Sequence, residues 1–198
     1  CNVPALPLGV TYLGTTCGDV HGVARRSDGS VVAWGLNIYG QCNVPALPAG
    51  AAYAQIAAGS SHTVLLRSNG HTVAFGRNAS GQCNVPPLGA GLTYVEVAAG
   101  QDHSLALRSN GTVVGFGSNA MGQLNAPPLS GGRKYIAISA GIFNNLARLS
   151  DDSIVGWGWN TSGQNAVPPL RHGFAFAAVE AGYEHSAGLF SRQGEYMR

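Results

Sequence analysis

Histidine recurs at one position of a 41-residue frame, and this pattern comes closest to a metal site. The residues are His21, His62, His103 and His185, with Asn144 at the same position in the fourth unit. Zinc needs ligands that converge at about 2.0–2.1 Å from one ion, whereas equivalent residues of successive repeats belong to separate structural units. Asparagine can take over the donor and acceptor roles of an imidazole. We therefore expect no metal and no other cofactor, and expect each histidine to form a hydrogen bond within its own Gly-x-x-His turn.

Cysteine is the second residue type that could carry chemistry. Three cysteines share one repeat position, namely Cys1, Cys42 and Cys83, and Cys17 lies at another. A disulfide requires Cα atoms within about 7 Å, and equivalent positions on separate units should not meet that condition. Leu124 and Asn165 replace the shared cysteine in later units. We therefore expect free thiols, which favours an intracellular or organellar compartment.

Motifs for catalysis are absent from the sequence. It contains no nucleophile elbow, phosphate-binding loop, metalloprotease helix or paired carboxylates. The formal net charge is only +2 and charged residues make up 10% of the chain, which does not predict nucleic-acid binding. No apolar run approaches the roughly 18 residues of a membrane span. We expect a protein that is not an enzyme, with no catalytic, cofactor or metal residues.

The whole chain is tiled by one repeated unit. The string CNVPALP begins at residues 1 and 42, and CNVPPLG begins at residue 83, so the period is 41 residues. The sequence predicts a single domain over residues 1–198, divided into repeats 1–41, 42–82, 83–123, 124–164 and 165–198. Repeats of this length indicate an array in which neighbouring units complete each other's core.

Each unit has the pattern of a small antiparallel sheet. In the third unit, Val95, Val97 and Ala99 alternate with other residues, which is typical of a strand. A glycine then marks a tight turn, and a second apolar run ends in the hairpin signal Asn110-Gly111. A third run ends in a large aromatic residue. The aromatic residues at this position are Trp34, Phe75, Phe116 and Trp157, and we expect them to fill the gaps between sheets.

The segment AAGQDHSLALRSNGTVVGFGSNAMGQ, residues 98–123, resembles the regulator of chromosome condensation 1 (RCC1) repeat. The resemblance extends over essentially the whole chain. It implies an all-β propeller built from four-stranded blades, with five blades in this chain, whereas members of the family usually have seven. Two arrangements remain open: a closed five-bladed ring, in which the first CNVP completes the last blade, or an open arc of a larger ring.

The turn after the first strand and the loop after the third strand should emerge on one rim of such a propeller. Their sequences differ most among the five units, so they are free to carry function. Several of these residues are apolar or aromatic, as in the cores of protein interfaces. The residues predicted to bind a partner are Ile38, Tyr39, Met121, Ile142, Phe143, Trp159, Tyr183 and Glu184.

These observations predict a non-catalytic protein-interaction scaffold, an accessory or structural subunit that docks on a larger assembly through one propeller face. The expected partner is another protein or a multi-subunit complex, with neither nucleic acid nor a membrane span involved. The resemblance implies two alternatives, a guanine-nucleotide exchange factor acting on a small GTPase and an enzyme-inhibitory propeller. Fold alone does not choose among these functions.

Overall fold

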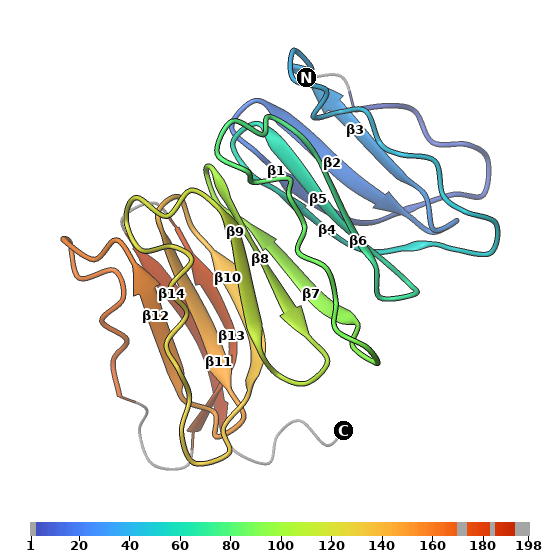
Figure 1. The fold of residues 1–198 in the computed structure, drawn as a ribbon. Helices are drawn as coiled ribbons and strands as arrows, with labels where there is room; N and C mark the ends of the chain where they lie inside the picture. The colour runs from blue at the N-terminus through green and yellow to red at the C-terminus, as the bar shows by residue number, and fades with distance from the viewer. Residues whose placement is uncertain (1–2, 170–173, 183–184, 193–198) are drawn as a thin grey trace.

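The computed structural model describes residues 3–169, 174–182 and 185–192, and in this part of the chain every regular element is a β-strand. The strands form antiparallel sheets in chain order (Figure 1). The first four sheets are β1 (Tyr12–Cys17), β2 (His21–Arg26) and β3 (Val31–Gly35); β4 (Tyr53–Ala58), β5 (His62–Arg67) and β6 (Thr72–Gly76); β7 (Tyr94–Ala99), β8 (His103–Arg108) and β9 (Val113–Gly117); and β10 (Tyr135–Ala140), β11 (Asn144–Leu149) and β12 (Ile154–Gly158). The last consists of β13 (Phe174–Ala181) and β14 (Ser186–Arg192). The predicted all-β fold of repeated blades is confirmed.

The first strands of successive sheets contact one another, which makes them the innermost strands of a fan of blades. Figure 1 shows the first and last sheets at opposite ends of the row. β1 to β3 do not pack against β13 and β14 in the way that neighbouring sheets pack. In β1, accordingly, Tyr12 is only half-buried, whereas the equivalent tyrosines that begin β4, β7 and β10 are buried. Within the described residues, the first and last sheets therefore do not pack against each other.

The CNVP stretch differs from the expectation of a fourth strand in each blade. Residues 42–48 contain no strand, partly because Pro45 has no N–H for a ladder. A side chain fixes this stretch instead: the Tyr53 hydroxyl donates to the Pro45 carbonyl at 2.7 Å. Equivalent bonds join Tyr12 to Pro4 and Tyr94 to Pro86. The first four blades therefore have three strands each, and in the first three of them a tyrosine hydroxyl fixes the proline-containing segment.

A β-bulge interrupts the simple alternation that the sequence predicts for the first strand of each blade. In β7 the register shifts between Tyr94 and Glu96, so Tyr94 and Val97 are buried while Val95 is 49% exposed.

The glycines that follow these strands also serve a different purpose from the tight turn that the sequence predicts. Gly59 does not have a positive φ; a Cβ there would collide with the His62 ring and with the Gly100 carbonyl of the next blade. Close packing, rather than a tight turn, requires this glycine.

Apolar side chains fill the gaps between blades, as the aromatic positions predict. Between the second and third blades, Phe116 packs with Val64 and Tyr94. Between the third and fourth, Trp157 packs with Leu105 and Tyr135, and its ring lies 6.1 Å from that of Tyr135. Between the first and second, Phe75 packs against the cluster of Val23, Val31, Tyr53 and Leu65. Trp34 is half-buried and belongs to none of these clusters in the described residues.

A ladder of buried histidines joins the same blades. The Nε2 atom of His62 lies 2.9 Å from Ser104 Oγ in the next blade, and that hydroxyl donates to the Gln82 carbonyl at 2.9 Å. Because the serine proton points to the carbonyl, the imidazole must be the donor to Ser104. His21 bonds Thr63, and His103 bonds Asn145, in the same way. The expected bond within each histidine's own turn is therefore wrong, because the ring packs on its own glycine and its nitrogen reaches the next blade.

The ladder keeps its imidazoles neutral. Burial lowers the pKa of His62 to about 3, with further lowering from His103 and His21. Burial also lowers the pKa of His103 and His21. A charged imidazole in this buried place would lose its hydration without sufficient compensation. The packing of the blades therefore requires neutral rings.

A second polar contact between blades lies at the innermost strands. Gln55 Oε1 accepts from the Val97 N–H of the next blade at 2.8 Å. One blade further on, Glu96 Oε2 accepts from the Ile138 N–H at 3.3 Å. Burial raises the pKa of Glu96 to about 7; Glu180 adds to this rise, while the Ile138 hydrogen bond and Arg148 oppose it. The same position thus holds a neutral amide in one gap and a titratable acid in the next.

Removing one rung of the histidine ladder should destabilise the blade array. His62→Ala should lower the free energy of unfolding by about 2–3 kcal/mol, since it leaves a cavity and removes a buried hydrogen bond. Urea unfolding measures the change. His71→Ala, at an exposed hairpin position, is the matched control and should change stability by less than about 0.5 kcal/mol. Equal effects of the two substitutions would contradict the structural role.

Glu96→Gln should stabilise the protein more as the pH rises. The folded pKa lies near 7 and the ordinary value is 4.5, so the folded state binds the proton more tightly and the wild-type protein loses stability between these values. The variant should be about 1–2 kcal/mol more stable at pH 8 and nearly equal at pH 4. Unfolding across this pH range tests it. The reciprocal change Gln55→Glu should introduce a similar loss of stability as the pH rises. A stability difference between Glu96→Gln and the wild-type protein that does not change with pH would refute the explanation.

Asp152→Gly should stabilise the fourth hairpin. Asp152 has φ of 63° in the slot that Gly29, Gly70 and Gly111 occupy elsewhere, a conformation that costs a side-chain residue about 1 kcal/mol. Its contact with Arg148, at 3.3 Å, is partly exposed and contributes little. Thermal unfolding should show a gain of about 0.5–1 kcal/mol. Asp152→Asn keeps a side chain in this conformation and removes only the charge, so it should not reproduce the gain.

Candidate functional site

The two variable segments of each blade meet on one rim. The N–H of Leu36, after β3, donates to the Val20 carbonyl, between β1 and β2, at 2.9 Å. The same backbone bond recurs in the next three blades, where it joins Arg77 to Ser61, Ser118 to Asp102, and Trp159 to Phe143. The turn and the loop therefore emerge together, as the repeat pattern predicts, and their side chains share one surface.

The first blade gives this rim its most exposed apolar residues. Ile38 is 68% exposed, Tyr39 is 50% exposed and Leu36 is 45% exposed, and Val20 lies beside them. We call these four residues the blade-1 patch. Sequence reasoning assigned Ile38 and Tyr39 to partner binding and left out Val20 and Leu36, although both stand in the variable segments.

Of the remaining predicted residues, those that the structure describes lie on the same rim but differ in exposure. Met121, in the loop of the third blade, is 49% exposed. Phe143 and Trp159 are half-buried and pack edge to face, with ring centroids 6.0 Å apart. Ile142 is half-buried beside the inner end of the blades. Tyr183 and Glu184 lie outside the described residues.

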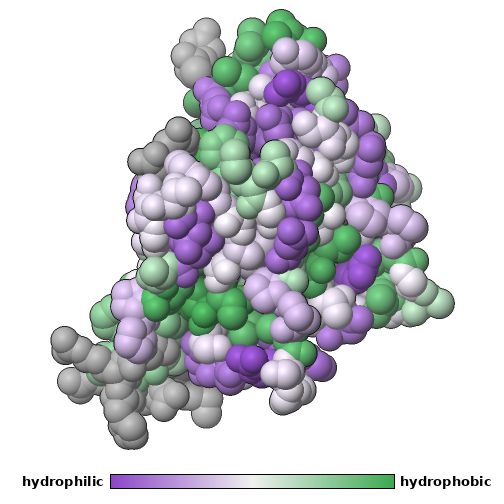
Figure 2. All heavy atoms as spheres, turned by 60° about the vertical axis from the view of Figure 1, so that its left-hand side comes forward, coloured by the Kyte–Doolittle hydropathy of each residue, from purple (hydrophilic) through white to green (hydrophobic). Residues whose placement is uncertain are grey.

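A polar bridge separates the blade-1 patch from the apolar residues of the third and fourth blades. Arg77 Nη1 donates to Asp102 Oδ1 at 2.9 Å, and Gln82 Nε2 donates to the same oxygen at 2.9 Å. This ion pair joins the second and third blades. Figure 2 shows one face of the molecule, on which hydrophobic residues form separate patches among hydrophilic ones. Along the chain, the ion pair of the second and third blades lies between the blade-1 patch and the pair of Phe143 and Trp159 in the fourth blade.

The inner turns of the blades surround a shallow hollow of about 210 Å³ at the axis. Its wall includes Asp19, Ser60, Gln101 and glycine backbone. The Ser60 hydroxyl donates to Asp19 Oδ2 at 2.7 Å, and the Ser60 N–H donates to the Gln101 carbonyl at 3.3 Å. These hydrogen bonds join the inner turns of the first, second and third blades.

The histidines and cysteines that the structure describes do not converge on one point. Within the described ranges, no group of three or more His, Cys, Asp or Glu residues is placed to hold a metal ion. Cys17, Cys42 and Cys83 are free thiols. The Cys83 thiol donates to the Arg77 carbonyl at 3.3 Å, and burial raises its pKa to about 11. A thiol with such a pKa is a poor nucleophile at neutral pH.

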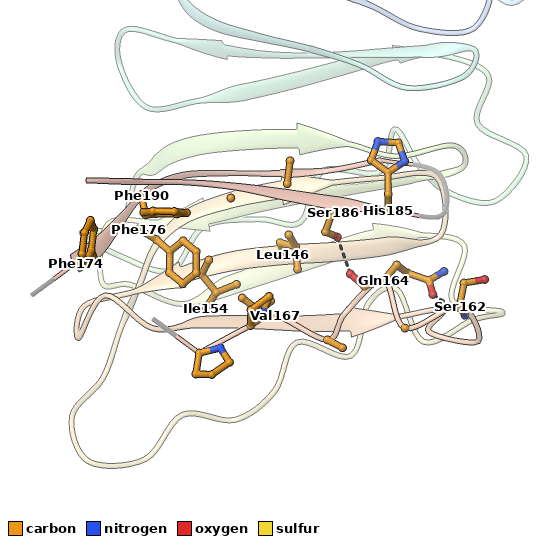
Figure 3. A pocket seen from close by; sticks show the side chains of 16 residues that line it. Leu146, Ile154, Ser162, Gln164, Val167, Phe174, Phe176, His185, Ser186 and Phe190 are labelled. Carbon is orange, nitrogen blue, oxygen red and sulfur yellow. Dashed lines mark hydrogen bonds between the residues drawn. The ribbon is translucent and has the colours of Figure 1, made fainter. Parts of the chain in front are cut away.

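One feature of the surface was missed from the sequence. A groove of about 620 Å³ lies between the fourth and fifth blades (Figure 3), lined by Leu146, Ile154, Phe176 and Phe190 among others. No helix long and apolar enough to cross a membrane occurs in the described residues.

Comparison with known proteins agrees with this geometry. The regulator of chromosome condensation (RCC1) repeat family model matches residues 15–41, 53–82, 94–123 and 135–164. No curated protein sequence matches the chain.

Several solved propellers share the fold. Prp20p from Saccharomyces cerevisiae, described with its binding to Gsp1p and histones, has a TM-score of 0.75 and 21% identity over 92% of this chain and 55% of its own. Human WBSCR16 has a TM-score of 0.77 and 19% identity over 94% of this chain and 62% of its own. The ectodomain of the Physcomitrella patens receptor kinase CR4 has a TM-score of 0.72 and 23% identity over 95% of this chain and 51% of its own.

The chain thus spans about half to three fifths of the solved structures that it resembles. Such identities establish a common fold, and the family match covers more than half of the chain. The repeated blades, the ladder between them and the family match agree: the chain belongs to the regulator of chromosome condensation (RCC1) repeat family.

Proposed function

We propose that this chain is a non-catalytic protein-interaction scaffold that docks on a larger protein assembly through the rim described above. The observation that carries the proposal is the blade-1 patch, in which Ile38 is 68% exposed and Tyr39 50% exposed beside Leu36. Apolar and aromatic side chains gathered at loop tips are the usual core of a protein-binding surface.

The loop that carries the patch is held rigidly, which favours binding. Asn37 Oδ1 accepts from the Cys42 N–H at 2.8 Å, and Asn37 Nδ2 donates to Asn43 at 2.8 Å. The buried Gln41 side chain accepts from the Tyr39 N–H at 3.0 Å. A loop fixed in this way loses little conformational entropy when its side chains are covered.

The arrangement suits a partner with an apolar cleft bordered by polar groups. Ile38 and Tyr39 would enter the cleft, and the Arg77–Asp102 ion pair would lie at the border, where charges chiefly set orientation and association rate. Nucleotide exchange on a small GTPase is the alternative implied by the family. Because Prp20p is described with its binding to Gsp1p, nucleotide exchange is measured beside partner binding in the test below.

Charge substitutions in the patch should abolish partner binding without unfolding the protein. Ile38→Asp and Tyr39→Asp should each weaken capture of the native partner at least about tenfold, because interface anchors contribute more than 1 kcal/mol. A photocrosslinking residue at position 38 identifies the partner in an extract of the source cells, and purified partner then gives the affinity.

Leu8→Asp is the matched control, since Leu8 is a fully exposed apolar residue in a proline-rich loop away from this rim. It should retain binding. Undiminished binding by both patch variants would reject this rim. Accelerated nucleotide release from a captured GTPase would favour the exchange-factor alternative over a scaffold.

A further inference from the structure

The hollow at the axis has walls of small residues. Its lining includes Cys17, Ala58, Ala99 and Ala140, each the last residue of the innermost strand of its blade, together with the glycines that follow them. Its volume of about 210 Å³ lies below the roughly 300–1,000 Å³ of pockets that hold drug-sized ligands. The hollow is therefore of the size of one long side chain.

One carboxylate lies in this wall. Asp19 is exposed, and the described lining of the hollow contains no other charged residue. Apart from the alanines and glycines, the other residues of the described lining are Cys17, Ser60, Gln101 and Ile142. The hollow thus combines a mainly apolar wall of small residues with a single negative charge.

No cation in the described part of the chain compensates this charge by an ion pair. The ion pairs found there join Arg77 to Asp102, Arg133 to Asp151, and Arg148 to Asp152. His21 stands two residues beyond Asp19, but burial lowers the pKa of His21, and the charge of Asp19 only opposes that lowering. Asp19 therefore offers its charge to a group from outside the described residues.

Hydrogen bonds hold the carboxylate and leave acceptors open. Asp19 Oδ2 accepts from the Ser60 hydroxyl at 2.7 Å, whereas no described residue donates to Oδ1. The wall also contains Gly59 and Gly100, and no backbone N–H of the described residues donates to the carbonyl of either glycine. Several hydrogen-bond acceptors and few donors thus border the hollow, which favours a ligand that brings N–H groups.

We propose that the hollow receives a lysine or arginine side chain of the partner protein. Such a side chain has an apolar stem and a charged end, which match the two parts of the wall. The stem would lie against Ala58 and Ala99, and the cation would pair with Asp19. An acidic side chain would be repelled by Asp19, and an apolar one would cover this charge without compensating it.

This inference rests on the proposed function, because it assigns a chemistry to the partner of the rim. Asp19 directly precedes Val20 of the blade-1 patch, and the Val20 carbonyl accepts from the Leu36 N–H at 2.9 Å. The partner would therefore present a basic residue next to the apolar residues that cover Ile38 and Tyr39. A charge pair beside an apolar contact fixes the orientation of the partner.

Cys17 allows the hollow to be tested before the partner is identified, since its thiol is free and exposed and lines the hollow. The full chain is equilibrated with cystamine, which attaches a short cationic chain to a thiol, and separately with bis(2-hydroxyethyl) disulfide, which attaches a neutral chain of similar length. Mass spectrometry of the peptide that contains Cys17 gives the two equilibrium constants. We expect the ratio of the cationic to the neutral constant to be at least about threefold higher in the wild-type protein than in Asp19→Asn, the size of a partly exposed ion pair.

Asp19→Asn keeps an oxygen for the Ser60 hydroxyl and removes the charge. Asp28→Asn is the matched control, because Asp28 also accepts from a serine hydroxyl, that of Ser30 at 2.6 Å, but lies in the hairpin between β2 and β3. It should keep the wild-type ratio. Equal ratios in the wild-type protein and Asp19→Asn would overturn the proposal, and so would an equal decrease in both variants.

The native partner separates a failure of this inference from a failure of the proposed function. Asp19→Asn should weaken capture of the partner at least about fivefold and make its affinity less dependent on salt, because one charge pair is lost. If Ile38→Asp abolishes capture while Asp19→Asn changes neither affinity nor salt dependence, the hollow is rejected and the scaffold remains. Unchanged capture by both variants would reject the whole rim.

Discussion

The contact between neighbouring blades is the interaction on which the rest of this structure depends. A sheet of three short strands cannot bury both of its faces, so each blade is stable only against the next. Two kinds of contact join them: an apolar cluster around Phe116 or Trp157, and a neutral histidine that donates across the gap. The polar contact has little tolerance for change, because a buried donor without its acceptor costs more than the bond contributes.

This constraint also determines where function can reside. The positions that form the gaps are restricted to small, aromatic or hydrogen-bonding residues, as Gly59 and His62 illustrate. The rim positions make backbone bonds that do not depend on their side chains, so Leu36, Arg77, Ser118 and Trp159 can occupy one slot. The fold therefore holds the rim rigidly while leaving its chemistry free, which is a suitable basis for a binding surface.

The first described blade differs physically from those that follow it. Its innermost strand, β1, begins with a half-buried Tyr12, whereas Tyr53, Tyr94 and Tyr135 at the same repeat position are buried. These three tyrosines lie in apolar clusters that include side chains of the preceding blade, which again shows that each blade completes its core against a neighbour.

The sequence by itself determined the strands, the period and the rim, because these depend on local patterns: alternating apolar residues, Asn-Gly and Asp-Gly turns, and an exact repeat of 41 residues. It also indicated that Phe75, Phe116 and Trp157 fill the gaps. It could not give the partner of each histidine, since Ser104 lies 42 residues beyond His62 and only the stacking of blades brings the two together. The ion pair between Arg77 and Asp102 on the rim was likewise decided by tertiary structure, because it depends on the position of one blade relative to another.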